Sequence, residues 1–312
     1  MHEKKVLVTG GGGFIGSHLA EALHPDNDVI VLDNFSMGTQ NKALLESQGM
    51  SVQTGDIQDR KTVTSCVRGV QTVFHLAAMN RAARSIENPL EANAVNVDGT
   101  LNVLEACRKH DVEKVVFASS SSVYGGGSDT KREDAACRPL HPYGVGKRTG
   151  EEYCRIYHEV YGLKTVVLRY VSVYGPRQRG DIPYAAVVPK FIEQIFEGKP
   201  LTVFGDGSQK RHFTYVQDTV DMTLAASKSA KAVGQVFNVA SPEETSINDL
   251  VTALERVTGK TAPIAHQPPA GSDPARNAMD TAKIKKILGV QAGHTLEDGL
   301  RKMVAWYQQE TR

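Results

Sequence analysis

The chain has 312 residues and a formal net charge of +1, with 40% hydrophobic and 23% charged residues. This composition is ordinary for a globular protein, and the balanced charge gives no electrostatic argument for binding nucleic acid or a membrane surface. No apolar run is long enough for a transmembrane helix, and the sequence begins with a strand-like segment rather than a signal peptide. We therefore expect a cytoplasmic protein. The cysteines and histidines show no metal-ligand spacing, so no metal site is expected.

Short β-branched runs alternate with helix-length stretches along the first half of the chain. Strands buried on both faces are predicted at 5–9, 29–33, 51–54, 72–76, 114–118 and 165–169. The alternation predicts an α/β fold with a doubly wound parallel sheet. Prolines interrupt the pattern after about residue 171, so we expect a first domain at 1–170 and a smaller α/β lobe, mainly at 171–312. A run near 235–240 is expected to return to the main sheet.

A glycine-rich segment, TGGGGFIGSH, follows the first predicted strand and opens a helix. Glycines let backbone amides approach a pyrophosphate, and a helix N-terminus supplies partial positive charge. Gly11, Gly13 and Gly16 fit G-x-G-x-x-G, whereas Gly10, Gly13 and Gly16 fit G-x-x-G-x-x-G. Asp33 ends the second strand, where a carboxylate accepts from the ribose hydroxyls of NAD and repels the 2′-phosphate of NADP. The segment therefore predicts NAD as the cofactor.

The segment HPYGVGK places Tyr143 and Lys147 four residues apart, so on a helix they share one face. A tyrosine with a pKa of about 10 is a poor base at neutral pH, but a lysine cation and the positive nicotinamide ring favour the phenolate. Such a phenolate takes a proton from a sugar hydroxyl as hydride leaves the same carbon. Tyr143 is therefore the expected catalytic base.

At this point the chain resembles the extended short-chain dehydrogenases/reductases, and most of all the nucleotide-sugar 4-epimerases typified by UDP-galactose 4-epimerase. The resemblance runs almost from end to end and covers TGGGGFIG, LDNFS, GDI, HLAA, NVDGT, SSSSVYG, YGVGK, LRYVSVYGPRQ and LTVFGDGSQKRHFTYV. It implies a Rossmann-type N-terminal domain that holds NAD and a smaller C-terminal domain that binds a UDP-sugar. It also implies a homodimer built on two helices from each subunit.

Position by position, the resemblance assigns roles to residues. The catalytic set is Ser120, Tyr143 and Lys147. The cofactor-binding set contains Tyr143 and Lys147 together with Gly10, Gly13, Phe14, Ile15, Gly16, Asp33, Asn34, Ser36, Gly38, Asp56, Ile57, Leu76, Ala77, Ala78, Asn96, Ser119 and Tyr170. The substrate-binding set contains Ser120 and Tyr143 together with Arg84, Ser122, Ser172, Val188, Phe204, Arg211, Asp218 and Asn277. Arg211 suits phosphate because a guanidinium binds its oxygens bidentately, and Phe204 is expected beside the uracil.

The serine run at 119–122 bears on the reaction. Related dehydratases carry an Asp-Glu pair at the positions of Ser121 and Ser122, and UDP-glucuronate decarboxylases carry a Glu at the second position. Both positions are serine here, which favours oxidation and re-reduction at C4 with no net consumption of NAD. A decarboxylase or dehydratase of the same family is the alternative. In extended geometry, Ser120 and Ser122 point to one side and Ser119 and Ser121 to the other.

Several departures from the family pattern concern the sugar. Ser172 replaces an asparagine that touches the sugar diphosphate, and Ala270 stands where a second phosphate arginine is expected, with Arg276 nearby to compensate. Asn277, at the position that gates the 2-substituent, is neither bulky nor very small, and Arg84 resembles members that accept N-acetylated sugars. The segment SSSSVYG also resembles UDP-glucuronate 4-epimerases, so the sequence leaves the sugar open. We favour UDP-glucose/UDP-galactose slightly over UDP-N-acetylglucosamine and UDP-glucuronate.

Two alternative hypotheses for this fold do not involve epimerisation. A non-catalytic NAD-binding sensor of this fold usually lacks the tyrosine and the lysine, both of which are present here. A net NAD-dependent dehydrogenase would accumulate NADH, whereas an epimerase would not.

Overall fold

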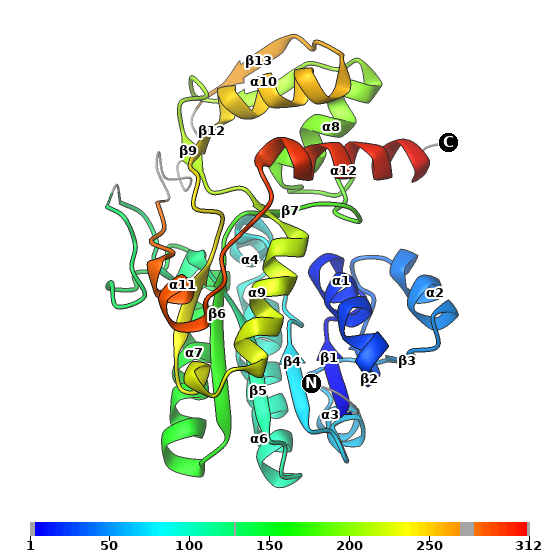
Figure 1. Ribbon diagram of the computed structural model, residues 1–312, viewed down its shortest axis with the longest axis vertical. Helices are drawn as coiled ribbons and strands as arrows, with labels where there is room; N and C mark the ends of the chain where they lie inside the picture. Colours follow the sequence, from blue (N-terminus) through cyan, green and yellow to red (C-terminus); the bar gives the residue numbers. More distant parts are fainter. Residues whose placement is uncertain (1–3, 128, 269–277, 311–312) are drawn as a thin grey trace.

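The computed structural model describes residues 4–127, 129–268 and 278–310, arranged as a larger and a smaller lobe (Figure 1). The larger lobe contains a seven-stranded sheet in the order β11-β6-β5-β4-β1-β2-β3, with all neighbours parallel. Its strands are β1 (Lys4–Thr9), β2 (Asn27–Asp33), β3 (Ser51–Thr54), β4 (Thr72–His75), β5 (Lys114–Ser120), β6 (Lys164–Tyr170) and β11 (Val236–Val239). The strand order reverses between β1 and β4, which confirms the predicted doubly wound α/β fold.

Helices cover both faces of this sheet (Figure 1). Val8 and Phe74 pack in one core with Leu19 of α1 and Val220 of α9. The opposite core is formed by the other faces of the strands with the helices α3, α6 and α7. The helices of this lobe are α1 (Phe14–Leu23), α2 (Gln40–Ser47), α3 (Arg60–Val67), α4 (Ala82–Glu87), α5 (Pro89–Asn93), α6 (Thr100–Lys109), α7 (Pro142–Tyr161), α9 (Val216–Lys228) and α11 (Ala282–Leu288). Burial on both faces explains why the strands read as continuous apolar runs.

The smaller lobe has its own apolar core, centred on Phe191, Leu201, Leu250 and Leu300. Its strands pair only two at a time, as β10 with β7, β12 with β9 and β13 with β8. The remaining elements are β7 (Val173–Tyr174), α8 (Val187–Glu197), β8 (Leu201–Phe204), β9 (Lys210–Arg211), β10 (Thr214–Tyr215), β12 (Thr245–Ser246), α10 (Ile247–Thr258), β13 (Ile264–Gln267) and α12 (Leu296–Glu310). The chain passes between the lobes repeatedly, because β11 lies in the main sheet while β8 and α10 lie in the smaller lobe.

The carboxyl ends of the sheet strands meet the smaller lobe, and a cavity of about 1150 Å³ lies between them. In doubly wound folds this edge of the sheet is where ligands bind, at the point of strand-order reversal. Among the described residues, no helix is long and apolar enough to cross a membrane. The same residues contain no group of three or more His, Cys, Asp or Glu side chains placed to hold a metal ion.

Candidate active site

Segments from both lobes line the cavity. The glycine turn, the ends of β2, β4, β5 and β6, and the start of α7 form the wall of the larger lobe, while α8, β9 and the end of α12 contribute from the smaller lobe. The predicted residues that line it are Gly10, Gly13, Phe14, Ile15, Gly16, Asp33, Asn34, Ser36, Gly38, Asp56, Ile57, Leu76, Ala77, Ala78, Arg84, Ser119, Ser120, Ser122, Tyr143, Lys147, Tyr170, Ser172, Val188 and Arg211. The fold therefore brings most of the predicted set to one site.

The glycine turn leaves no room for side chains at two of its positions. Gly10 has a φ of +70°, and a Cβ there would lie 2.6 Å from the backbone nitrogen of Ala77. A Cβ on Gly16 would lie 2.1 Å from the carbonyl oxygen of Gly10. Gly13 is the N-cap of α1, so the free amides of the first turn face the cavity edge. This cradle fits a pyrophosphate at a helix N-terminus, as NAD requires.

Asp33 lies at the end of β2, beside the glycine turn. Its Oδ2 accepts a hydrogen bond from the amide of Gly12 at 3.0 Å, and its Oδ1 accepts one from the amide of Phe35 at 2.7 Å. Burial raises the pKa of Asp33, while these amide contacts act in the opposite direction. The carboxylate is held at the cavity wall with further lone pairs, which suits the two ribose hydroxyls of NAD. Next to it, Asn34 donates to Asp56 at 2.7 Å.

Tyr143 and Lys147 lie one turn apart at the start of α7, where His141 caps the helix. The Lys147 ammonium donates to the carbonyl oxygen of Ala118 at 2.6 Å and lies 5.9 Å from the centre of the Tyr143 ring. Burial lowers the pKa of Lys147 to about 8, so the side chain is charged at neutral pH. Burial raises the pKa of Tyr143, while a hydrogen bond with Ser120 and the charge of Arg81 lower it. The arrangement suits a tyrosine that exchanges a proton next to a fixed cation.

The serine run changes conformation in its middle. β5 ends at Ser120, and Ser121–Val123 forms a 3₁₀ turn in which the Ser120 hydroxyl accepts from the amide of Ser122 at 3.1 Å. Our expectation of simple extended alternation is therefore wrong beyond Ser120, because the turn tightens the backbone there. Ser120 and Ser122 still line the cavity, whereas Ser121 is buried outside it.

A buried ion pair supports this wall from behind. Arg169 of β6 binds Glu151 of α7 through two nitrogens, at 2.8 and 2.7 Å, and both side chains are 2% exposed. Ser119 donates to the same carboxylate at 2.6 Å. The pair therefore fixes β5, β6 and α7 relative to one another. His75, which is neutral because burial lowers its pKa to about 3, bridges Thr9 and Thr100 in the same core.

Asn96 is one predicted cofactor residue that does not line the cavity. It lies in a π-helical segment, Ala94–Gly99, and its side chain exchanges two hydrogen bonds with the backbone of Met79, at 2.8 and 3.0 Å. Asn96 thereby holds the segment that follows Ala78, which does line the cavity. Asn96 therefore supports the cavity wall through the backbone of Met79 and does not line the cavity itself.

The predicted substrate residues are more dispersed. Arg211 is buried against the cavity, and its guanidinium donates to the carbonyl of Lys210 at 2.6 Å. Asp218 lies outside the cavity lining and accepts from the amides of residues 293 and 294 and from the His294 ring. Phe204 also lies outside the lining, at the end of β8, and is 44% exposed. Ala270, Arg276 and Asn277 lie outside the described residues.

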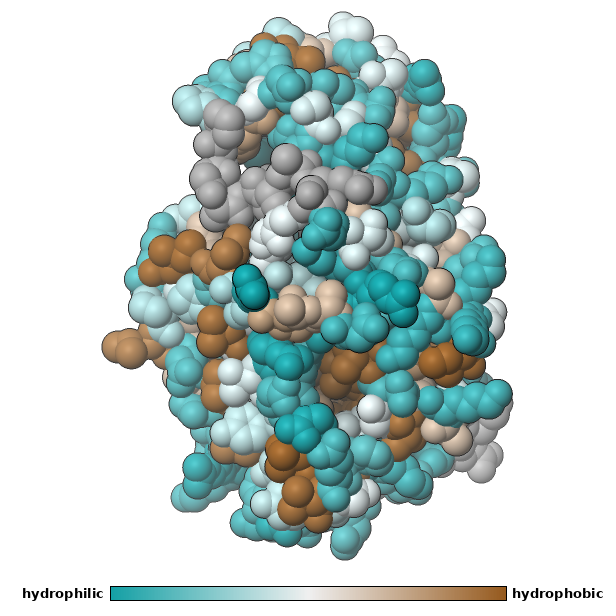
Figure 2. All heavy atoms as spheres, turned by 90° about the vertical axis from the view of Figure 1, so that its left-hand side faces the viewer, coloured by the Kyte–Doolittle hydropathy of each residue, from teal (hydrophilic) through white to brown (hydrophobic). Residues whose placement is uncertain are grey.

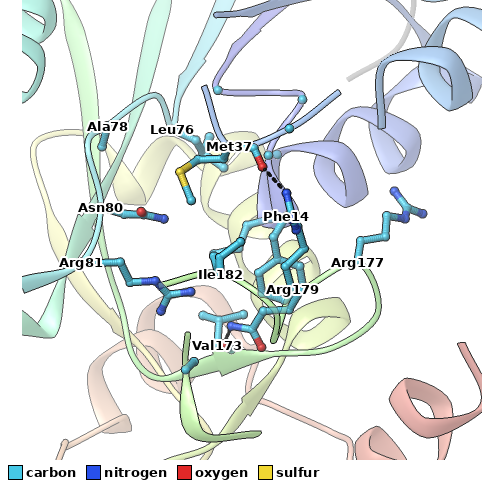
Figure 3. A pocket seen from close by; sticks show the side chains of 18 of the residues that line it. Phe14, Met37, Leu76, Ala78, Asn80, Arg81, Val173, Arg177, Arg179 and Ile182 are labelled. Carbon is cyan, nitrogen blue, oxygen red and sulfur yellow. Dashed lines mark hydrogen bonds between the residues drawn. The ribbon is translucent and has the colours of Figure 1, made fainter. Parts of the chain in front are cut away.

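Sequence reasoning missed two polar residues of the wall, Asn80 and Arg81. Asn80 Oδ1, Arg81 Nε and Gln178 Oε1 are buried without a hydrogen-bond partner among the described residues, and all three side chains line the cavity. Buried polar atoms are normally paired, so these atoms mark places where a ligand would complete the hydrogen bonding. Figure 3 shows Asn80 and Arg81 on the segment after Ala78, with Arg177 and Arg179 on the opposite side. Asn80 and Arg81 lie two and three residues after the HLAA motif, and this position in the sequence could have indicated that they line the cavity.

A comparison with protein families agrees with this geometry. Residues 6–240 match the model of the NAD dependent epimerase/dehydratase family. The chain belongs to this family. The resemblance drawn from the motifs is therefore confirmed, and NAD is the cofactor of the family.

Individual relatives match this epimerase/dehydratase chain over nearly its whole length. A Bacillus subtilis protein described as an uncharacterized UDP-glucose epimerase is 36% identical over 97% of each chain. A UDP-N-acetyl-α-D-glucosaminuronate decarboxylase of Bacillus cytotoxicus is 35% identical over 98% of each chain. The structure of a Bacillus cereus UDP-glucuronic acid 4-epimerase mutant, with a fluorinated UDP-glucuronic acid and NAD, has a TM-score of 0.92 at 35% identity, covering 98% of this chain and 99% of that one. The relatives thus differ in their sugar and in their reaction.

Proposed function

We propose that this chain catalyses NAD-dependent 4-epimerisation of a UDP-sugar through a transient 4-keto sugar. The observation that carries the proposal is the wall made by Ser120, Tyr143 and Lys147, which has no carboxylate at Ser121 or Ser122. A relative of this chain is described as a UDP-glucuronate 4-epimerase, and two structural neighbours are described as UDP-glucuronic acid 4-epimerases in complex with NAD, which supports the same reaction. The decarboxylase among the relatives keeps loss of CO₂ as the second candidate for a hexuronate substrate.

The chain's own residues perform the proton chemistry in this proposal. Gly10, Gly13 and Gly16 would hold the pyrophosphate of NAD and Asp33 its ribose, and the bound NAD supplies hydride acceptance and return at C4. Tyr143 takes the proton from O4, and Lys147 stabilises the phenolate. Ser120 hydrogen-bonds O4 and relays the proton, since its hydroxyl both donates and accepts. After the keto sugar turns in the cavity, Tyr143 returns the proton and C4 is inverted.

The UDP moiety is assigned to the smaller lobe. Arg211 and Val188 line the cavity there, and a guanidinium is suited to bidentate contact with phosphate oxygens. Ser172 lines the cavity with a φ of +38°, in the left-handed region that asparagine adopts more readily than serine. Phe204, Asp218 and Asn277 remain proposed substrate residues.

The test is a product assay with purified protein and UDP-glucose, UDP-N-acetylglucosamine and UDP-glucuronate. We expect the C4 epimer of at least one of these, with no net NADH and no CO₂. Unchanged stereochemistry with all three, or release of CO₂ from UDP-glucuronate, would contradict the proposal.

We also propose a homodimer. Val145 of α7 is 50% exposed and lines a shallow hollow together with Pro89, Pro139 and Leu140. Leu90 of α5, which follows Pro89 in the chain, is 86% exposed. Figure 2, which views the molecule from the left of Figure 1, shows hydrophobic patches that interrupt a mostly hydrophilic surface. Helix faces of this kind are typical of subunit interfaces. Light scattering should give a dimer mass, and Leu90→Glu should shift it toward the monomer.

A further inference from the structure

Several arginines line the cavity, and three of them form ion pairs within the chain. Arg84 pairs with Glu91 at 3.1 Å, Arg177 with Glu21, and Arg179 with Asp181 at 2.7 Å. Arg179 additionally donates to the carbonyl of Met37, as the dashed line in Figure 3 shows. These three side chains therefore hold the walls of the cavity together.

Arg81 differs from these three. No ion pair joins it to an acid in the described part of the chain, whereas Arg177 pairs with Glu21. The buried Nε of Arg81 has no hydrogen-bond partner there, and the same holds for one terminal nitrogen of Arg177. Figure 3 shows its side chain extending from the segment of Ala78 and Asn80 toward the middle of the cavity, where Val173 and Ile182 are also drawn. Burying a guanidinium without an anionic partner costs free energy. A bound anion from outside the chain would offset this cost at Arg81.

The backbone at Arg81 is also strained. Its φ is +77° and its ψ is +123°, in a region that residues with a Cβ rarely adopt. Such a conformation costs roughly 1–3 kcal/mol and persists where the surrounding structure holds it in place. Here the amide of the nearby Met79 is held by Asn96, and α4 begins immediately afterwards, at Ala82. With this backbone conformation, the side chain of Arg81 lies at the cavity wall.

The neighbours of Arg81 locate it at the reacting end of the cavity. Ser85 lies on α4, the helix that Arg81 precedes, and its hydroxyl accepts a hydrogen bond from the amide of Tyr143 at 3.0 Å. Arg81 and Tyr143 therefore lie on neighbouring segments of the cavity wall. Burial lowers the pKa of Arg81, and the nearby Tyr143 acts in the opposite direction. Lys147 supplies a second positive charge to the same tyrosine. The phosphate cradle of Gly10 to Gly16 lies at a different wall of the cavity, beside α1. Arg81 is therefore placed beside the tyrosine that would handle O4.

Sugar chemistry limits which anion can reach this point. In a UDP-sugar the diphosphate is attached at C1, across the pyranose ring from C4. C6 is attached to C5, the direct neighbour of C4, so a carboxylate at C6 lies next to O4. UDP-glucose and UDP-N-acetylglucosamine have no charge at C6, whereas a UDP-hexuronate has one. A guanidinium and a carboxylate form two parallel, charge-assisted hydrogen bonds.

We propose that Arg81 binds the C6 carboxylate of a UDP-hexuronate and makes a hexuronate the preferred substrate of this site. The inference rests on the proposed 4-epimerase function, because that function places O4 at Tyr143. It replaces our slight sequence-based preference for UDP-glucose/UDP-galactose. The sequence motifs did not assign this role to Arg81, since the residue belongs to none of the motifs that carry the resemblance.

The first experiment measures binding, so that it does not depend on turnover. NAD-loaded Tyr143→Phe protein is titrated calorimetrically with UDP-glucuronate, UDP-glucose and UDP. We expect UDP-glucuronate to bind about 10-fold more tightly than UDP-glucose. Adding Arg81→Gln should weaken UDP-glucuronate binding about 10- to 100-fold, as for a lost charge-assisted hydrogen bond, and change the other two ligands by less than about threefold.

Two further variants separate this role from a structural one. Arg81→Gly removes the side chain while accepting the positive φ, so it should show the same selective loss with an unchanged or higher melting temperature. Arg256→Gln removes an exposed arginine of α10 and should change none of the affinities. An equal loss for all three ligands, or a loss of bound NAD, would overturn the inference, because Arg81 would then serve UDP or the cofactor.

The product assay distinguishes this inference from the proposed function. Epimerisation of UDP-glucose without use of UDP-glucuronate would keep the proposed function and reject the role of Arg81. A binding preference for UDP-glucuronate that depends on Arg81, in a protein that epimerises no sugar, would keep the role of Arg81 and reject the proposed function.

Discussion

The cofactor half and the substrate half of the cavity are built in different ways. On the cofactor side, a parallel sheet places the glycine turn, Asp33 and the Tyr143–Lys147 pair along one rigid edge. On the substrate side, the sheets have only two strands each. Non-glycine residues with positive φ line that side at Ser172 and Arg177. Under the proposed function, the difference teaches that NAD recognition would depend largely on backbone shape, whereas sugar recognition would depend on individual side chains of loops. Substitutions can test this contrast.

The largest expected effect on turnover is that of replacing Tyr143, the proposed base, which lies between the two halves of the cavity. Tyr143→Phe removes the hydroxyl that exchanges the O4 proton, so kcat should fall about 100- to 10,000-fold while bound NAD is retained. The measurement is turnover with the preferred UDP-sugar together with NAD content after purification. Tyr161→Phe, on an exposed tyrosine of the same helix, is the control and should leave both unchanged. Full activity of Tyr143→Phe would show that Tyr143 is not the catalytic base.

The buried side chain of Lys147 should make the stability of the protein depend on pH. Its pKa is lowered to about 8 by burial, so the unfolded chain binds the proton more strongly than the folded one between pH 8 and the ordinary lysine value. The wild type should therefore gain about 3 kcal/mol of unfolding free energy over Lys147→Met as pH rises through this window. Denaturant titrations of both proteins from pH 7 to 10.5 measure the gain. A constant difference between them would show that the buried lysine is not destabilised as a cation.

The glycine cradle tests the backbone argument for the cofactor half. Gly16→Ala places a Cβ against the carbonyl of Gly10, so the turn must shift and NAD affinity should fall about 10- to 100-fold. Gly126→Ala is a matched control, since its Cβ would meet only a Leu140 methyl at an ordinary 3.7 Å. NAD binding is measured by fluorescence titration, with circular dichroism to check the fold. Equal affinities in the two variants would contradict a backbone-defined site.

The smallest expected effect is at Phe204, on the substrate side. If the exposed ring stacks on the uracil as the sequence predicts, Phe204→Ala should raise KM for the UDP-sugar about fivefold with kcat unchanged, at the lower end of stacking energies. Ile264→Ala, on the paired strand β13, is the control. An unchanged KM would show that the uracil lies elsewhere in the smaller lobe.

The sequence predicted the main sheet and the segments that meet at its carboxyl edge, because their constraints are local. Alternating apolar runs determine the sheet, and the glycine turn, Asp33 and the Y-x-x-x-K spacing each occupy one short segment. The rest depends on tertiary placement. The 3₁₀ turn after Ser120, the hydrogen bonds of Asn96 to the backbone of Met79, and the unpaired Arg81 arise only when distant segments meet. Asp218 and Phe204 were assigned by position in a motif, which says nothing of whether a side chain faces the cavity.

The most direct test of the central claim follows the hydrogen at C4. A UDP-sugar that is a substrate, labelled with deuterium at C4, is incubated with the purified protein and analysed by NMR and mass spectrometry. We predict that both C4 epimers appear with the deuterium still on C4 and with no accumulation of NADH, because hydride leaves and returns within one active site. Washout of the label into solvent, or one NADH formed for each sugar consumed, would contradict epimerisation by transient oxidation at C4.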